Sequence, residues 1–588
     1  MKGLTVYLKP YWKFLILGPL FMIFEVFFDL LQPRLAAHIV NFGIMDRDFT
    51  VIEQTGFIML GVAILSLVTG VACNLFASRA SQNFGADVRE ALFKKVQTFS
   101  FENVDSFKSG SLITRMTSDV VQVQNLIQMA LQGMVRAPSL LIGSVVMALL
   151  MNLKLGLILL GTLIVLVAAL TVLIRFSTPI FTTVQAKLDA VNTRIQENLA
   201  GIRVVKAFVR TDYETKKFHE VNEAYTHISI RAARFIALNS PIVTLIMNAC
   251  MVTILLYGGD LVAFGSVQAG DLVAFVNYVV QVLSSLIMVS GLLINVTQAR
   301  VSAKRIQEVL ETKPNIEGAE RAKAAQVPAQ HVKIEQVSFS YNGSSDSKDL
   351  VLRDINIEAS RGETVAIIGA TGSGKTTLVQ LLPRLYDVTS GSIIIDGKDI
   401  RELPLDELRS QIGMILQESF LFTGSIRDNI AFGNPNATQE EVESAAMIAQ
   451  AHDFIVKLPD GYKTKLGQKG VNLSGGQKQR VSIARALLVK PPILIIDDSM
   501  SALDLGTERR LRGALQAIMK DTITFLIAQR ISSVRNAQKI LVLDEGIIVG
   551  SGTHEQLMLT CDVYQDIYRS QFGKEEETYV SQKSIHSV

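Results

Sequence analysis

Cysteine is scarce in this chain of 588 residues. The three cysteines, Cys73, Cys250 and Cys561, lie far apart, and none has a second Cys or His at metal-ligand spacing. This pattern excludes a disulfide framework and argues against a zinc site. Low-complexity tracts and internal repeats are also absent from the sequence.

Charged residues are few as well. They make up 19% of the chain, below the roughly 25% of ordinary soluble domains, while 49% of the residues are hydrophobic and the mean hydropathy is +0.33. The net charge of +3 conceals a division, because residues 1–300 hold 24 Lys and Arg against 18 Asp and Glu, and residues 301–588 hold 33 against 36. A basic, apolar half therefore precedes a slightly acidic one. The length allows about three or four domains, or a large membrane unit and one globular domain.

Six stretches of the first half have the length of a membrane-spanning helix, which takes about 20 apolar residues. We predict spans at residues 14–40, 54–78, 137–153, 155–174, 235–259 and 272–299. Only the first is interrupted by several charges, namely Glu25, Asp29 and Arg34. It is too long and too charged for a cleaved signal peptide, so we expect it to stay as a membrane helix.

Basic residues are distributed unevenly among the connections. The two long ones, residues 79–136 and 175–234, hold 7 and 10 basic residues, whereas the opposite connections contain only Arg47 and Lys154. By the positive-inside bias, both termini, the long loops and the second half of the chain are expected in the cytoplasm. We expect the protein to lie in the plasma membrane. The long loops contain few Gly or Pro, which predicts helical extensions of the spans, and residues 152–154 predict a tight hairpin.

The sequence pattern changes after a linker at residues 311–330. Short β-rich runs, at residues 364–368, 392–395, 493–496 and 540–543, alternate with helical segments. This pattern predicts an α/β domain with a largely parallel sheet. We expect a polytopic α-helical membrane domain at residues 1–310, the α/β P-loop domain at residues 331–570, and a charged, mobile tail at residues 571–588.

A phosphate-binding loop follows the first of these strands. The segment GATGSGKTT comprises Gly369, Ala370, Thr371, Gly372, Ser373, Gly374, Lys375, Thr376 and Thr377, and it opens a helix, as a Walker A loop does. Its backbone N–H groups close around phosphates, Lys375 reaches the β- and γ-phosphates, and Thr376 binds Mg²⁺. Asp497, at the end of an apolar strand, has the Walker B position that holds the metal. The sequence thus predicts ATP and Mg²⁺ as cofactors.

Many ATPases share the two Walker motifs. The segment LSGGQKQR, which ends 17 residues before Asp497, narrows the choice among them. With six spans ahead of it, the chain resembles the ATP-binding cassette (ABC) transporters of the exporter type over nearly its whole length. The resemblance implies that two cassettes close head to tail. In that arrangement the signature contacts ATP bound on a partner chain through Leu473, Ser474, Gly475, Gly476 and Gln477.

Further positions follow from the same resemblance. Tyr341 corresponds to the aromatic residue that stacks on adenine, and Gln417 to the residue that contacts Mg²⁺ and the γ-phosphate. The D-loop between the two ATP sites corresponds to Ser501, Ala502, Leu503 and Asp504. Gln468 replaces an acid that exporters often carry in a Gly-Glu-Arg-Gly loop. Residues 103–110 and 211–216, at the tips of the long loops, correspond to coupling helices.

Two catalytic positions depart from the family pattern. Asp498 stands where a Glu activates water, and its shorter side chain draws the carboxylate back by about 1 to 1.5 Å, a misplacement that can cost roughly a hundredfold in rate. Gln529 stands in place of the switch histidine; it can donate a hydrogen bond but cannot carry the imidazole's charge. Each change can be a tolerated variant, but together they favour a site that binds ATP and hydrolyses it weakly. Since the signature is intact, we predict a heterodimer with a second half-exporter that has the Glu and the His, as in bacterial multidrug exporters.

The sequence leaves three classes of function open. Glu25 and Asp29 share a helix face and offer negative charge to an organic cation, which suits an exporter of hydrophobic compounds. The same acids can instead pair with Arg34 or another helix, or face a water-filled cavity. The second class is a flippase for lipids or lipid-linked glycans, with basic cavity residues, and the third is a regulatory subunit that touches no cargo. The membrane spans exclude a nucleic-acid repair ATPase, and the fusion of membrane domain and cassette excludes a lone importer cassette.

Overall fold

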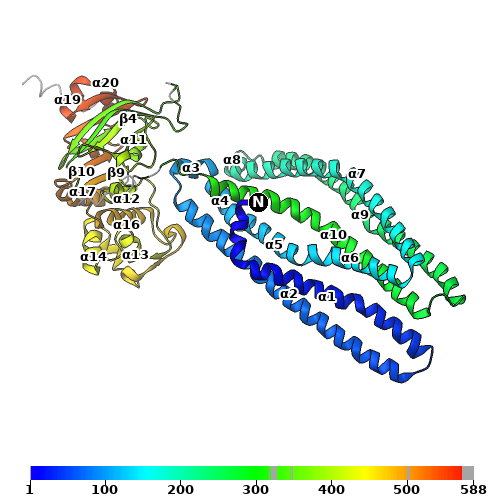
Figure 1. The fold of residues 1–588 in the computed structure, drawn as a ribbon. Coiled ribbons are helices and arrows are strands. Elements are labelled where there is room, and N and C mark those ends of the chain that lie inside the picture. The colour runs from blue at the N-terminus through cyan, green and yellow to red at the C-terminus, as the bar shows by residue number, and fades with distance from the viewer. Residues whose placement is uncertain are drawn as a thin grey trace, which may run out of the picture. The chain divides into compact units, whose positions relative to one another are not determined.

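The computed structural model describes residues 2–316, 318, 328–344, 346, 348–498 and 503–572. It divides into two compact units. The first extends to Gln97 and resumes from Gly110 to Thr312, and the second takes Thr98–Ser109 and the chain from Lys313 onward. Long helices form the first unit, and strands covered by helices form the second (Figure 1).

Among its described residues, the helical unit contains six helical runs that are long and apolar enough to cross a membrane, which confirms the predicted number. Its α-helices are α1 (Trp12–His38), α2 (Phe49–Gln97), α4 (Ser109–Thr114), α5 (Val120–Leu131), α6 (Gly133–Met151), α7 (Leu153–Ala200), α8 (Ile202–Ala207), α9 (Thr211–Ala263) and α10 (Ala269–Glu311). The longest, α2, α7 and α9, have 49, 48 and 53 residues. At 1.5 Å per residue they are about 70–80 Å long, over twice the thickness of the hydrocarbon core. The polar loops of the sequence are therefore continuations of the apolar helices.

The hairpin between α6 and α7 is as tight as the sequence predicts. Only Asn152 separates the two helices, and its Oδ1 accepts a hydrogen bond from the backbone N–H of Leu155 at 3.2 Å. This N-cap satisfies one of the open N–H groups at the start of α7. At the second loop tip, residues 211–216 form the first turns of α9, and the separate short helix before them is α8.

The second unit is built on two main sheets. A six-stranded sheet has the order β12-β11-β3-β10-β9-β6 and a four-stranded antiparallel sheet has the order β2-β1-β4-β5. Of the described strands in the larger sheet, only β11 and β12 pair antiparallel, which agrees with the largely parallel sheet that we predict. The strands are β1 (His331–Phe339), β2 (Leu352–Ser360), β3 (Thr364–Ile368), β4 (Ser390–Ile395), β5 (Lys398–Asp399), β6 (Ile412–Ile415), β7 (Gly424–Ser425), β8 (Lys465–Leu466), β9 (Ile493–Asp497), β10 (Ile523–Ile527), β11 (Lys539–Asp544) and β12 (Ile547–Gly552).

Helices cover these sheets and carry several of the motifs. They are α11 (Lys375–Leu381), α12 (Leu405–Ser410), α13 (Ile426–Ile430), α14 (Gln439–Ile448), α15 (His452–Ile455), α16 (Gly475–Leu488), α17 (Leu505–Met519), α18 (Ile531–Val534), α19 (His554–Thr560) and α20 (Asp562–Phe572). The residues of β3 and β9 are all buried. Their continuous apolar runs are typical of parallel strands with both faces covered.

One short helix from the first long loop belongs to the second unit. This helix, α3 (Phe101–Phe107), lies in the segment Thr98–Ser109. Its Asn103 closes a capping box with Ser100 and donates a hydrogen bond from Nδ2 to Oδ1 of Asn315 at 3.1 Å. The first expected coupling segment, residues 103–110, therefore begins within a helix that is fixed to the start of the second unit.

The C-terminal helix extends past residue 570, where the sequence places the end of the domain. It runs to Phe572, so Gln571, which we assign to the tail from sequence, lies in α20. The remainder of the expected tail, residues 573–588, is outside the described residues.

Candidate functional site

A cavity of about 210 Å³ lies where parallel strands of the large sheet end. Ligands of open α/β sheets typically bind at this edge. Its lining consists of Val351, Thr371, Gly372, Gly374, Lys375, Thr376, Thr377, Gln417, Asp497, Asp498, Ile527 and Gln529. The fold thus brings together the Walker A loop, the Walker B aspartate, Gln417 and both departing positions.

The loop between β3 and α11 has a backbone that glycine permits. Gly372 and Gly374 have φ angles of +86° and +99°, in the region that side chains disfavour. A Cβ at Gly369 would collide with the carbonyl oxygen of Leu543, whereas a Cβ at Gly372 would meet none of the described atoms within 4 Å. The loop is therefore packed on the side of the sheet and open on the side that faces the cavity, as a phosphate cradle requires.

Lys375 supplies the cation of this cradle. Its Nζ donates hydrogen bonds to the carbonyl oxygens of Gly369 at 2.9 Å and Ala370 at 2.6 Å. Burial lowers the pKa of Lys375, and the nearby Asp497 and Asp498 act in the opposite direction. A partly desolvated ammonium group gains from an anionic phosphate, so this position fits the predicted ligand.

Oxygen ligands for a divalent cation lie beside it. The hydroxyl of Thr376 donates to Oδ1 of Asp497 at 3.3 Å, and the side chain of Gln417 lines the same cavity. Burial raises the pKa of Asp497. A hydroxyl, a carboxylate and an amide carbonyl are ligands that Mg²⁺ accepts. These residues fit the predicted metal, which would supply positive charge to offset that of bound phosphate.

The two departing positions contact each other directly. Gln529 donates a hydrogen bond from Nε2 to Oδ2 of Asp498 at 2.7 Å. Burial raises the pKa of Asp498, and Lys375, Arg530 and the hydrogen bond from Gln529 oppose this rise. Sequence alone places these residues 31 positions apart; the structure brings them together because β9 and β10 are adjacent parallel strands.

Tyr341, which the resemblance assigns to adenine stacking, contacts Thr377 of the cavity lining. Its hydroxyl forms a 2.9 Å hydrogen bond with Oγ1 of Thr377, and its ring meets Tyr386 edge to face with centroids 5.2 Å apart. The residue stays 43% exposed. The hydrogen bond ties the ring to the Walker A loop, and the exposed portion is available to a base.

The signature, which lies wholly within the described residues, does not line the cavity of its own chain. It forms the start of α16, where Ser474 and Gln477 close a capping box and Leu473 is buried. A Cβ added to Gly475 would meet none of the described atoms within 4 Å, so this turn presents open backbone at Gly475 to its surroundings. Ser474 accepts from the N–H of Gln477, which leaves its hydroxyl proton available to a ligand.

The D-loop is described only in part. Leu503 is buried, and Asp504 caps α17 by accepting a hydrogen bond from the N–H of Thr507 at 2.9 Å. Hydrogen bonding from Thr507 lowers the pKa of Asp504. Ser501 and Ala502 lie outside the described residues.

The acids of the first span have a partner that sequence reasoning missed. Arg136 of α6 forms ion pairs with Glu25 and, at 2.9 Å, with Asp29, and Ser66 donates to Asp29 at 2.8 Å. The pairing with another helix is thus the arrangement found, and the partner is Arg136 rather than Arg34. We define Glu25, Asp29 and Arg136 as the charge triad. Its only signal in the sequence is a basic residue at the edge of an apolar span.

Comparison with known proteins identifies both units. Residues 15–286 match the ABC transporter transmembrane region, and residues 352–501 match the ABC transporter domain. An uncharacterized ABC transporter ATP-binding protein of Bacillus subtilis, YfiB, is 42% identical over 98% of this chain and 99% of its own length.

Further relatives carry more specific names. An ATP-dependent lipid A-core flippase of Syntrophus aciditrophicus is 34% identical over 89% of this chain and 87% of its own. A putative multidrug export ATP-binding/permease protein of B. subtilis, YgaD, is 32% identical over 97% and 99%. An ATP-bound bacterial exporter of the Atm1 family has a similar structure, with a TM-score of 0.76, 25% identity and coverage of 95% of this chain and 98% of that one. The chain therefore belongs to the ABC transporter family and has the architecture of an exporter half-transporter, with a membrane domain and an ATPase cassette in one polypeptide.

Proposed function

We propose that this chain is the subunit of an asymmetric ABC exporter that binds ATP at its own Walker site and hydrolyses it weakly. The observation that carries the proposal is the 2.7 Å hydrogen bond from Gln529 to Asp498. A glutamine amide occupies one oxygen of the carboxylate that would have to orient water, and that carboxylate stands on a side chain one methylene shorter than glutamate. Both effects reduce the effectiveness of the general base.

The remaining residues of the site serve binding. Lys375 would hold the β- and γ-phosphates, the loop backbone around Gly372 would surround them, and Thr376, Asp497 and Gln417 would hold Mg²⁺. Tyr341 would support the adenine. In this arrangement Gln529 can turn one of its N–H groups from Asp498 to the γ-phosphate and so respond to ATP without acting on water.

A second chain would complete each ATP site. The signature stands apart from the Walker cavity of its own chain, which supports its service to a partner. An intact signature beside a weak Walker site is useful if the partner carries the Glu and the His. The conformational cycle would then be driven mainly by hydrolysis at the partner's Walker site.

The proposed location is the plasma membrane, with both termini and the cassette in the cytoplasm. The support is the excess of basic residues in the loops of 58 and 60 residues at positions 79–136 and 175–234.

Hydrophobic cations are the proposed cargo class. Two carboxylates and one guanidinium give the charge triad a formal charge of −1, and its members keep partial exposure, with 27% for the Asp29 side chain and 32% for Arg136. A cation near Asp29 would compete with Arg136 for the carboxylate, so binding can be coupled to a change between helices. Glu25 and Asp29 remain the candidate cargo contacts.

A lipid cargo is the second candidate, because two relatives are named as lipid A-core flippases. In that case Arg136 would be the group that meets a phosphate. Reconstituted vesicles distinguish the two cargoes: a cationic dye should move at an ATP-dependent rate that Asp29→Asn reduces, whereas a fluorescent phospholipid should move only if the protein is a flippase.

The assembly is tested by purifying the chain alone and with a half-exporter that carries the Glu and the His. We expect at least about tenfold more ATP hydrolysis from the pair, on the scale that a misplaced base costs. Neutralising the partner's Glu should abolish that activity, while Asp498→Asn should leave most of it. Substantial cargo-stimulated ATPase from the lone chain would overturn the proposal.

A further inference from the structure

The segment that carries Gln529 continues directly into the short helix α18. We define residues 529–534 as the switch segment. A helix leaves its first N–H groups without intrahelical partners, and a side chain at the N-cap usually accepts from one of them. Here the N-cap is Arg530, whose side chain makes no cap hydrogen bond within the described part of the chain. The acceptor must come from elsewhere.

Gln571 of α20 supplies it. Its Oε1 accepts a hydrogen bond from the N–H of Ile531 at 2.8 Å, and its Nε2 donates to the carbonyl oxygen of Gln529 at 2.7 Å. The opposite orientation of the amide would place donor against donor and acceptor against acceptor, so the chemistry fixes its direction. One side chain thus holds the backbone on both sides of Arg530, immediately next to the residue that contacts Asp498.

Hydrophobic packing also joins α18 to α20. Ile531 and Val534 of the switch segment are fully buried in a cluster with Leu557 and Tyr564, which come from α19 and α20. Tyr564 is itself fully buried. A shift of α20 would therefore carry the switch segment with it.

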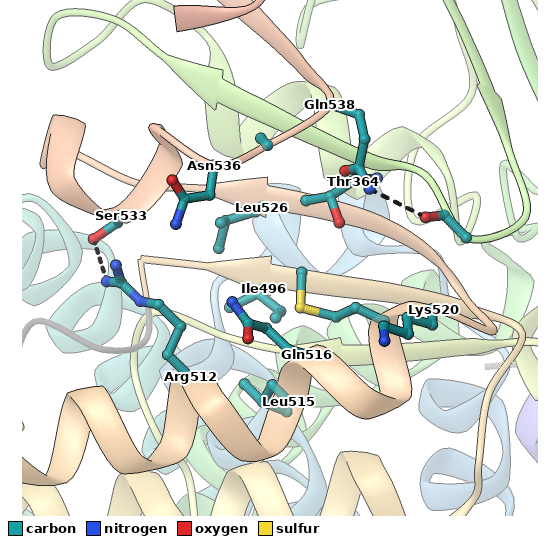
Figure 2. Close-up of a pocket in the computed structure, with 13 residues that line it drawn as sticks. Thr364, Ile496, Arg512, Leu515, Gln516, Lys520, Leu526, Ser533, Asn536 and Gln538 are labelled. Carbon is teal, nitrogen blue, oxygen red and sulfur yellow. Dashed lines mark hydrogen bonds between the residues drawn. The ribbon is translucent and has the colours of Figure 1, made fainter.

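The other side of the switch segment borders a cavity of about 230 Å³, shown in Figure 2. Arg512 of α17 reaches along this cavity and donates to the carbonyl oxygen of Ser532 at 2.7 Å and to Oγ of Ser533 at 2.9 Å. Glu508 accepts from Arg512 at 2.5 Å. The position of the segment on this side depends on directed hydrogen bonds, because close packing is interrupted by the cavity.

We propose that Gln571 is a positioning residue for the γ-phosphate contact of Gln529, so that the C-terminal helix sets how well this site distinguishes ATP from ADP. The two nucleotides differ in the γ-phosphate. Of the switch segment, which is described throughout, only Gln529 lines the cavity of the Walker A loop. Loss of the Gln571 hydrogen bonds lets Gln529 sample more positions and weakens the contact that ATP alone makes. The inference rests on the nucleotide-binding part of the proposed function and is independent of weak hydrolysis.

The test uses the full chain and compares the affinities of a fluorescent AMP-PNP analogue, which is not hydrolysed, and fluorescent ADP. Gln571→Met keeps the length of the side chain and removes both hydrogen bonds. We expect about fivefold to tenfold weaker AMP-PNP binding, the scale of one or two neutral hydrogen bonds, with ADP binding changed by less than about twofold. Gln571→Glu, which keeps the acceptor for Ile531 and loses the donor, should give an intermediate loss.

Gln565→Met is the matched control, because Gln565 lies on the same helix and donates to the carbonyl oxygen of Met558 at 3.0 Å, away from the switch segment. It should leave the ratio of the two affinities unchanged. In a Gln529→Ala background Gln571→Met should have no further effect on that ratio. Equal losses for both nucleotides, an unchanged ratio, or a full effect in the Gln529→Ala background would each overturn the proposal. Should Gln571→Met fail to fold, Gln571→Glu carries the same comparison.

Discussion

The hydroxyl group of Tyr386 donates a hydrogen bond to Oδ2 of Asp105 at 2.8 Å. Tyr386 also meets Tyr341 edge to face, and the ring of Phe101 lies 6.1 Å from its own. The short helix α3 of the first long loop is thus linked through one tyrosine to Tyr341, which contacts the Walker A residue Thr377.

Tyr386→Phe should loosen α3. Burial and the hydrogen bond to Asp105 raise the pKa of Tyr386, so the hydroxyl stays protonated and able to donate. The stability that this hydrogen bond contributes is present below the ordinary tyrosine pKa. It is lost only as the pH rises through the raised pKa. We expect about fivefold faster amide hydrogen exchange in α3, the effect of one modest hydrogen bond. Asp105→Asn keeps an acceptor and should change exchange less. Equal exchange in Tyr386→Phe and the parent chain would contradict this linkage.

Asp498→Glu combined with Gln529→His should restore hydrolysis at this chain's Walker site. The longer side chain returns the carboxylate toward water and the histidine removes the competing amide. In the complex with a partner whose own Walker Glu is neutralised, we expect a gain of about tenfold to a hundredfold in ATP turnover. Gln529→His alone is the control and should give less. Absence of any gain would remove the support that side-chain length gives to the proposed function.

Gly475→Ala should reduce the ATPase activity of the complex without reducing the stability of the fold. None of the described atoms lies within 4 Å of the added Cβ, and Gly513 of α17 offers the same free space. Neither substitution should lower the melting temperature. Because the signature backbone is proposed to contact the partner's nucleotide, only Gly475→Ala should reduce ATPase of the complex, by at least about tenfold. Equal activity of the two variants would argue against that contact.

Arg136→Met should destabilise the membrane unit. Removal of the guanidinium leaves two carboxylates that share one face of α1 without their cation, at a cost of about 2–4 kcal/mol, since the triad is only partly buried. A thiol-reactive dye can follow thermal unfolding, because Cys73, Cys250 and Cys561 are buried.

The neutral triple variant Glu25→Gln, Asp29→Asn, Arg136→Gln serves as the comparison for that experiment. It removes the charges and keeps hydrogen-bonding groups, so it should be more stable than Arg136→Met. If the two variants have the same melting temperature, Arg136 does not stabilise the membrane unit through its charge.

Mild acid should weaken the end of the cassette through His554. Burial lowers the pKa of this imidazole, and its Nδ1 lies 2.8 Å from the hydroxyl of the buried Tyr564. A lowered histidine pKa gives stability that is fully present above the ordinary value of about 6.5 and is lost as the pH falls from that value through the lowered one. We expect a lower melting temperature at pH 5.5 than at pH 7.5, and a smaller difference in His554→Gln. An identical pH dependence in both proteins would rule out this assignment.

The sequence by itself determined the elements whose signals are local. Apolar length specified six spans, and glycine spacing followed by Lys375 and Thr376 specified the phosphate loop. The residue types at Asp498 and Gln529 indicated an unusual site without any structure. These features depend on neighbouring residues in the chain, so periodicity and spacing reveal them.

Only the tertiary structure decided which distant side chains meet. The pairing of Arg136 with Asp29 joins residues 107 positions apart, and the contact between Gln571 and Gln529 joins residues 42 positions apart. The sequence predicted Arg136 to lie in a loop and Gln571 in a tail, because neither stands in a motif. Such contacts follow from the packing of helices and the order of strands, which sum many weak interactions along the whole chain.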